Sequence, residues 1–158
     1  PGPPAHARAS ALADPNPPPA TCRLSHPHFQ LKGGHPLTEN YSVVRPEIIE
    51  GLDNRKLAGI NQQLMDTLLA FDAVVIAGQA KSHCVAWTVA DLLSEIENKN
   101  PALATKVYLL EDCTSPVVIP DVIDYTEPAN KAFEQFEKAG MHIVRSTAAW
   151  SDGPGFPS

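Results

Sequence analysis

The sequence predicts an α/β fold built on a parallel sheet, and three observations lead to that prediction. Three apolar runs of strand length are separated by two segments whose apolar residues recur at helical spacing. The resulting order of strand, helix, strand, helix, strand makes two consecutive βαβ units, which require parallel strands and right-handed crossovers. The chain has 158 residues, 43% of them hydrophobic and 19% charged, which is enough for one domain with one hydrophobic core.

The two ends of the chain differ from its middle. Seven of the 16 prolines lie within residues 1–20, and this stretch has no apolar period of a strand or a helix. We therefore expect residues 1–28 to be a disordered or non-native leader, residues 29–147 to be the folded domain, and residues 148–158 to be a flexible tail.

The first predicted elements are a helix and a strand. The helix is predicted by one apolar stripe, with Asp53 or Asn54 as its cap: Leu57, Ile60, Leu64, Leu68 and Phe71. Residues 73–78 then form a continuous apolar run without a charge, which is typical of a parallel strand buried on both faces.

The remaining elements follow the same alternation. Helical spacing from Val85 to Ile96 predicts a helix that ends before Asn100, and residues 106–110 form the next predicted strand. After a loop rich in Thr, Ser and Pro, a third helix is stopped by Gly140, and residues 141–144 form the last strand.

Charge and composition exclude several function classes. The net charge of -6 and the scattered Lys and Arg residues give no basic surface for nucleic acid. The longest apolar stretch is far shorter than a membrane span, and no secretory signal precedes the domain. Three cysteines without a Cys-x-x-Cys pair favour a reducing compartment, so we expect a cytoplasmic protein with a small-molecule substrate.

In parallel α/β sheets a ligand binds beyond the carboxyl ends of the strands, so the loop of residues 78–84 is a candidate site. This loop places Cys84 at the first turn of the following helix. Free N–H groups at a helix start favour a thiolate and can also bind a developing oxyanion. The alternative is that Cys84 is a small core residue, and its position alone does not separate the two.

An ordered set of motifs resembles the isochorismatase-like cysteine hydrolases, of which the nicotinamidases are the best-known members. The matching segments are Leu31-Lys32-Gly33, Tyr41-Ser42, the run from Val74 to Val85, and the run from Val107 to Ser115. The resemblance implies a three-layer, doubly wound parallel sheet of six strands whose first strand lies beside residues 73–78. It also implies hydrolysis of a carboxamide through a cysteine thioester, with release of ammonia.

The resemblance also assigns roles to individual residues. Cys84 would be the nucleophile, Lys32 would hold the thiolate and position the substrate, and the N–H groups of Ala80 and Cys84 would form the oxyanion hole. The Gln79–Ala80 peptide bond would be cis. Without the resemblance, Lys32 would be a solvated lysine in a glycine-rich turn.

The substrate contacts are less well determined. Tyr41 and His83 are candidates to flank a flat ring, with ordinary packing for Tyr41 and a solvent-facing helix start for His83 as the alternatives. Lys81 is a second cation close to Cys84, where the family more often has a small polar residue. Asp112 and Ser115 are expected to fix their own loop, and Trp87 receives no role.

Two expected features of the family are absent from the sequence. The family's proton carrier is an aspartate at the end of the first strand, but Asp14 is the only acidic residue before Glu39 and lies among prolines. Many nicotinamidases hold a zinc or iron ion, but their Asp and His pattern is absent here. His26, His28 and His35 make a weak ligand set, so we expect no cofactor within this chain.

These absences lead to three hypotheses. The first is a cysteine hydrolase truncated at its N-terminus, with little activity of its own. The second is an inactive relic or interaction module of the same fold, in which the uncharged edge strand of residues 73–77 pairs with another chain, as in a homo-oligomer. A nucleotide-binding domain is the weakest, because no glycine-rich phosphate turn follows a strand.

Overall fold

The structure is a computed structural model that describes residues 27–147. The chain divides into two units, Pro1–Gln30 and Leu31–Ser158, and every element described here belongs to the second. Residues 1–26 of the expected leader and the whole expected tail lie outside the described residues. None of the described helices is long and apolar enough to cross a membrane.

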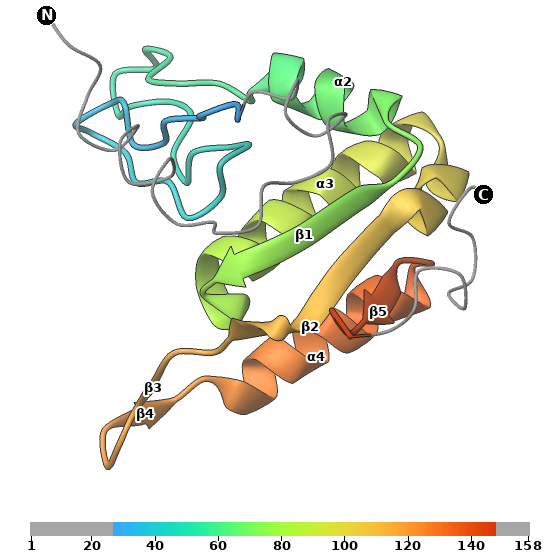
Figure 1. The fold of residues 1–158 in the computed structure, drawn as a ribbon. Helices are drawn as coiled ribbons and strands as arrows, with labels where there is room; N and C mark the ends of the chain where they lie inside the picture. The colour runs from blue at the N-terminus through green and yellow to red at the C-terminus, as the bar shows by residue number, and fades with distance from the viewer. Residues whose placement is uncertain (1–26, 148–158) are drawn as a thin grey trace, which may run out of the picture. The chain divides into compact units, whose positions relative to one another are not determined.

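A parallel sheet of three strands organises the second unit (Figure 1). The strands are β1 (Val74–Gln79), β2 (Val107–Ser115) and β5 (His142–Val144), and their spatial order is β1-β2-β5. The register pairs Val75 with Tyr108, and Tyr108 in turn with His142. The parallel α/β fold that the sequence predicted is therefore confirmed.

The two crossover helices lie on one face of this sheet. The α-helices among the described residues are α2 (Gln62–Ala70), α3 (Ala86–Lys99) and α4 (Thr126–Lys138), with a short 3-10 helix at Pro101–Lys106. Helix α3 joins β1 to β2, helix α4 joins β2 to β5, and the two helices contact each other behind the sheet (Figure 1). Their inner sides and the sheet share one buried cluster: Val89, Leu92, Ile96, Val107, Leu109, Phe133, Phe136 and Met141.

The other face of the sheet has no helix among the described residues. Val75 points to that face and is 40% exposed, whereas its neighbour Val74 is buried. The described part of the chain thus shows two of the three expected layers.

Strand β1 has the edge position expected from the missing first strand, but it is not buried on both faces as its apolar run predicted. It is an edge strand of the described sheet, and its burial falls from Val74 to the exposed Gln79. The apolar run could not reveal this, because it specifies a strand but not the number of its neighbours.

Helix α2 also differs from its prediction, since it begins at Gln62 rather than near Leu57. The side chain of Asn61 caps it by accepting a hydrogen bond from the N–H of Leu64 at 3.1 Å. Leu57 instead donates its N–H to the carbonyl of Ile49 at 2.8 Å, which holds that part of the chain outside the helix.

The ends of the other helices follow the sequence signals. Helix α3 ends at Lys99, directly before Asn100, and Gly140 follows the cap of α4 with a φ of +102°, a conformation that favours glycine. The loop expected after residue 110 contains more structure than predicted. Strand β2 continues to Ser115, and β3 (Val118–Ile119) pairs with β4 (Ile123–Asp124) in an antiparallel hairpin.

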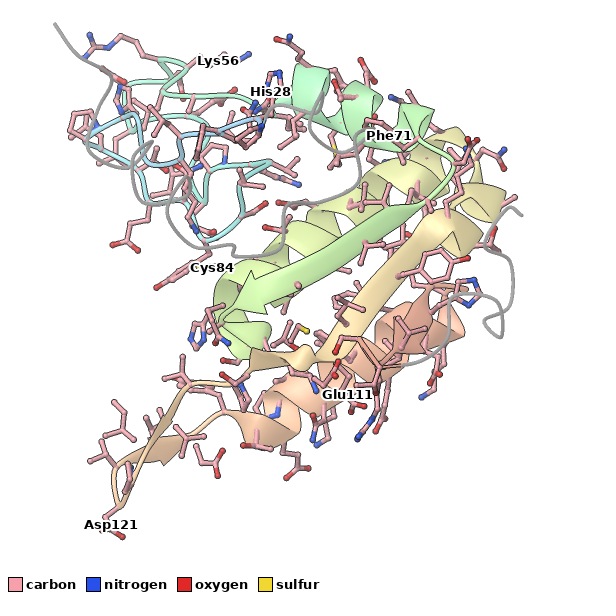
Figure 2. The ribbon with its side chains drawn as sticks, viewed as in Figure 1. His28, Lys56, Phe71, Cys84, Glu111 and Asp121 are labelled. Carbon is pink, nitrogen blue, oxygen red and sulfur yellow. The ribbon has the colours of Figure 1, made fainter. Side chains whose placement is uncertain are left out.

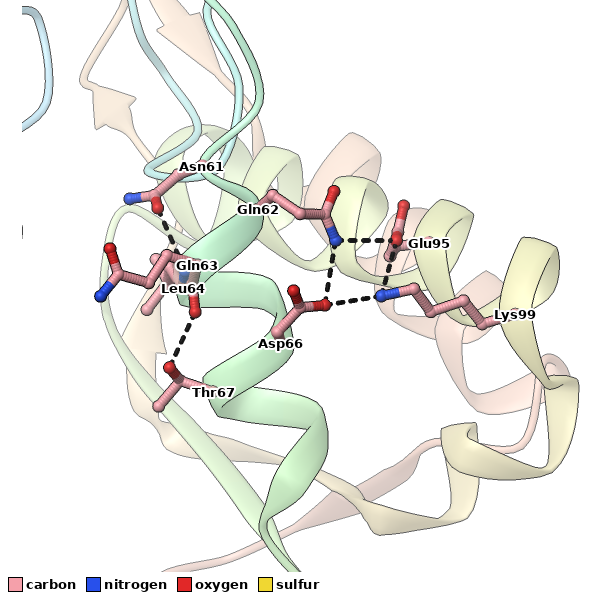
Figure 3. A network of polar contacts seen from close by, with 8 residues as sticks. All are labelled: Asn61, Gln62, Gln63, Leu64, Asp66, Thr67, Glu95 and Lys99. Carbon is pink, nitrogen blue, oxygen red and sulfur yellow. Dashed lines mark hydrogen bonds and ion pairs between the residues drawn. The ribbon is translucent and has the colours of Figure 1, made fainter.

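A polar network joins α2 to α3 (Figure 3). Lys99 Nζ lies 2.7 Å from Asp66 and 3.1 Å from Glu95, and Gln62 donates to both carboxylates. The hydrogen bond from Lys99 is the main cause that lowers the pKa of both carboxyls, and the one to Asp66 raises the pKa of Lys99. All three groups face solvent, so the network adds little to stability.

Candidate functional site

The candidate site begins where β1 ends. Gly78 has a φ of +121°, which favours glycine, and the Gln79–Ala80 peptide bond is cis, as the family resemblance implied. A π-helical turn, Lys81–Val85, follows and leads directly into α3. Such turns are rare in proteins, and those that occur often lie at functional sites. Figure 2 labels Cys84 at the arrowhead end of β1.

Backbone hydrogen bonds shape the turn around Cys84. The carbonyl of Ala80 accepts bonds from the residues on either side of Cys84, from His83 N–H at 3.0 Å and Val85 N–H at 3.1 Å. Cys84 is partly buried and its thiol is free. Cys113, on β2, is also free but exposed, and Cys22 lies outside the described residues.

Four ring side chains gather beside this turn, and we call them the aromatic group: Tyr41, His83, Trp87 and Tyr125. The ring of Tyr41 lies 5.9 Å from that of His83 and stacks on Trp87 at 6.1 Å. The ring of Tyr125 meets His83 edge-on at 4.7 Å. The structure thus brings together Tyr41 and His83, both candidates from the sequence, and adds two rings to them.

The two added rings differ in how far the sequence could reveal them. Trp87 follows His83 by four residues, so a continuous helical turn places both on one side of the helix. Tyr125 carries no such signal, because it reaches His83 only through the β3–β4 hairpin that precedes it.

The predicted lysine, Lys32, also lies in this region, where it bonds to a backbone carbonyl of the aromatic group. Lys32 Nζ donates a hydrogen bond to the carbonyl of Tyr41 at 2.8 Å, and its side chain is exposed. The segment after Tyr41 is fixed to α3, because Val43 N–H donates to Thr88 Oγ1 at 3.3 Å. Within the described part of the chain, no hydrogen bond or ion pair joins Lys32 to Cys84.

The imidazole of His83 is held by a short polar chain. Its Nδ1 lies 2.8 Å from Ser82 Oγ, and Ser82 Oγ accepts the N–H of Val117 at 3.0 Å. The turn is thereby tied to the loop that follows β2.

Lys81 faces away from this group, toward helix α4. Only 6% of it is exposed, its Nζ donates to Asn130 Oδ1 at 2.8 Å, and the Nζ lies 4.5 Å from the ring centre of Phe133. A hollow of about 410 Å³ adjoins it, with three carboxylates in its lining, Glu111, Glu134 and Glu137. The second cation expected near Cys84 therefore anchors the turn instead.

Asp112 and Ser115, which were expected to fix their own loop, lie on β2 and bond to other segments instead. Asp112 accepts hydrogen bonds from Ser146, at 2.8 Å from its N–H and 2.7 Å from its hydroxyl. The hydroxyl bond is the main cause that lowers the pKa of Asp112. Ser115 lies within hydrogen-bond distance of the side-chain amide of Gln79.

The described residues do not fit a metal ion. No three His, Cys, Asp or Glu side chains among residues 27–147 are grouped to hold one, and His35 Nδ1 accepts the N–H of Leu37 at 3.3 Å. His26 and the candidate proton carrier Asp14 lie outside the described residues. We therefore derive no step through a metal.

Fold and site together define an α/β unit with a cysteine-bearing turn at the carboxyl end of an edge strand. Two solved structures are similar to it. One is an Acinetobacter baumanii nicotinamidase pyrazinamidease, 20% identical, covering 70% of this chain and 43% of its own, with a TM-score of 0.42. The other is PnC1 from L. infantum in complex with nicotinate, 19% identical, covering 70% and 44%, with a TM-score of 0.44.

The chain spans less than half the length of either structure. No family model and no curated protein matches the sequence. The functional argument therefore depends on the site itself.

Proposed function

We propose that this chain is the cysteine-bearing part of a hydrolase that cleaves small aromatic carboxamides through a thioester on Cys84. One observation supports the proposal most directly: the free thiol of Cys84 lies in the turn that opens α3, and this turn also holds a ring of the aromatic group. A flat substrate ring can stack among these side chains while its carbonyl meets the thiol.

The chemistry of an amide explains why these parts belong together. An amide carbonyl is a poor electrophile, so its attack requires a thiolate and donors for the oxyanion that forms. Cys84 supplies the first. The bonds to the Ala80 carbonyl come from the N–H groups of His83 and Val85. We assign the N–H groups of Cys84 and Ala80 the role of oxyanion donors. Lys32, held on the backbone of Tyr41, adds a positive charge to the same region.

An interaction module is the second candidate. It is favoured by the edge position of β1, where exposed backbone groups without a neighbouring charge can pair with a strand of another chain, including a second copy. For the location we propose the cytoplasm, which the two free thiols support.

Ammonia release from nicotinamide, pyrazinamide and acetamide tests the proposed function. We expect release from the two aromatic amides to depend on Cys84, to be lost in Cys84→Ala and to persist in the matched variant Cys113→Ala. Equal release from the Cys84→Ala variant, or no Cys84-dependent release from any amide at high enzyme concentration, would exclude the hydrolase and leave the interaction module.

A further inference from the structure

A cysteine amidase needs a group that protonates the leaving nitrogen and later takes a proton from water. None of the ion pairs between described residues involves the turn of Cys84. The carboxylate of Asp112 is engaged with Ser146, and that of Glu47 accepts the N–H of Tyr41 at 3.3 Å. Among residues 27–147, no carboxylate is hydrogen-bonded or ion-paired to the turn of Cys84.

We propose that His83 is the proton-transfer residue of this site, an inference that rests on the proposed function. His83 directly precedes Cys84, so their Cα atoms are about 3.8 Å apart. Imidazole is the side-chain group that exchanges protons most readily at neutral pH. His83 is also a member of the aromatic group, so an amide stacked there places its nitrogen near the imidazole.

The hydrogen bonds of Ser82 orient the imidazole for this task. Ser82 Oγ has two acceptor positions, and the N–H of Val117 occupies one at 3.0 Å. Nδ1 of His83 lies 2.8 Å from the same oxygen, and we assign its N–H as the donor to the second position. This arrangement fixes the ring and leaves Nε2 to exchange the proton, and a base oriented by a third group is the usual design around a nucleophile.

The surroundings of the ring support proton exchange as well. The titratable rings that contact it are the phenols of Tyr41 and Tyr125. Lys81 belongs to the same turn but is bonded to Asn130 on α4. The imidazolium therefore meets aromatic rings rather than a second buried cation.

The reaction balances with His83 alone as carrier. The Cys84 thiolate attacks the carbonyl carbon and forms a C–S bond, and the C–N bond breaks as the His83 imidazolium gives its Nε2 proton to the leaving nitrogen, which departs as ammonia. Neutral His83 then takes a proton from water as its oxygen attacks the thioester. The C–S bond breaks, and acid, thiolate and imidazolium result.

The test compares two substrates of one acyl group, nicotinamide and p-nitrophenyl nicotinate. The nitrophenolate leaves without a proton, so a burst of nitrophenolate reports acylation of Cys84 independently of an acid. We expect His83→Gln to lower ammonia release by about 10² to 10⁴ and to keep the burst rate within about threefold of wild type, while slowing the steady state after it. Ser82→Ala should lower ammonia release by a smaller factor.

The control variant is His142→Gln, whose imidazole lies 3.0 Å from the carbonyl of Thr105 at the opposite ends of the strands. It should leave both reactions unchanged. Equal ammonia release from His83→Gln and wild type would overturn the proposal for His83 alone, and so would an equal loss of burst and amide turnover, which indicates a structural role. Absence of a Cys84-dependent burst would instead refute the proposed function.

Discussion

Lys81 provides a quantitative test of how the Cys84 turn is anchored. Its ammonium is nearly buried and donates to Asn130 at 2.8 Å. A hydrogen bond to a charged group contributes about 1.5 to 3 kcal/mol, and its loss leaves the charge unpaired. Asn130→Ala removes the acceptor but improves helix propensity by up to about 0.7 kcal/mol. We therefore expect a net destabilisation of about 1 to 2.5 kcal/mol.

A double-mutant cycle isolates this interaction. In a Lys81→Met background no buried charge remains, so Asn130→Ala should leave the stability unchanged or slightly raise it. The free energy of unfolding is measured by urea titration with the fluorescence of Trp87 as the local probe. If Asn130→Ala costs the same in both backgrounds, the hydrogen bond does not anchor the turn and the reasoning is wrong.

Three further predictions concern reactivity, pH and the proton supply. Iodoacetamide should alkylate Cys84 faster than the more exposed Cys113 at neutral pH, because N–H groups at a helix start stabilise the negative charge of an attacking sulfur; peptide mass spectrometry showing the reverse order would refute this. Lys99→Met should lower the melting temperature most between about pH 4.5 and 10.5. The carboxyl pKa values of Asp66 and Glu95 lie below their ordinary 3.8 and 4.5, so their contribution is lost as the pH falls through these lowered values. The pKa of Lys99 lies above 10.5, so its contribution is lost as the pH rises through it, and a difference independent of pH would contradict the network. Finally, in a His83→Gln background, an extended version with a preceding strand that ends in aspartate should hydrolyse nicotinamide at least about a hundredfold faster than the chain without it, and equal rates would show that the added carboxylate does not replace the imidazole.

The sequence predicted those elements whose signals are local. Helices α3 and α4 have both an apolar stripe and an end signal, at Asn100 and Gly140, and their predicted ends agree with the structure. The predicted start of α2 is wrong. Leu57 continues the helical spacing, but its N–H bonds to the carbonyl of Ile49, and apolar periodicity gives no information about such a bond. The β3–β4 hairpin has strands of two residues each, too short for any periodic pattern.

The candidate site likewise has features that neighbouring residues predict and features that depend on distant segments. The position of Cys84 at a helix start follows from neighbouring residues, and the cis bond before Ala80 follows from the family resemblance. The direction of Lys81 and the contact of Tyr125 with His83 depend on α4 and on the hairpin, because their partners lie 49 and 42 residues apart in the chain. No pattern of neighbouring residues in the sequence predicts such contacts.

The identity of the acylated residue tests the central claim most directly. The chain is incubated with p-nitrophenyl nicotinate, quenched in acid during the burst, and digested for peptide mass spectrometry. We predict one nicotinoyl group on the peptide that contains Cys84, removed by hydroxylamine as a thioester is, and absent from Cys84→Ala. Two results would contradict the assignment of Cys84 as the nucleophile. One is a nicotinoyl group that forms on Cys113 or on lysines at equal rates in wild type and in Cys84→Ala, and the other is the absence of any nicotinoyl group.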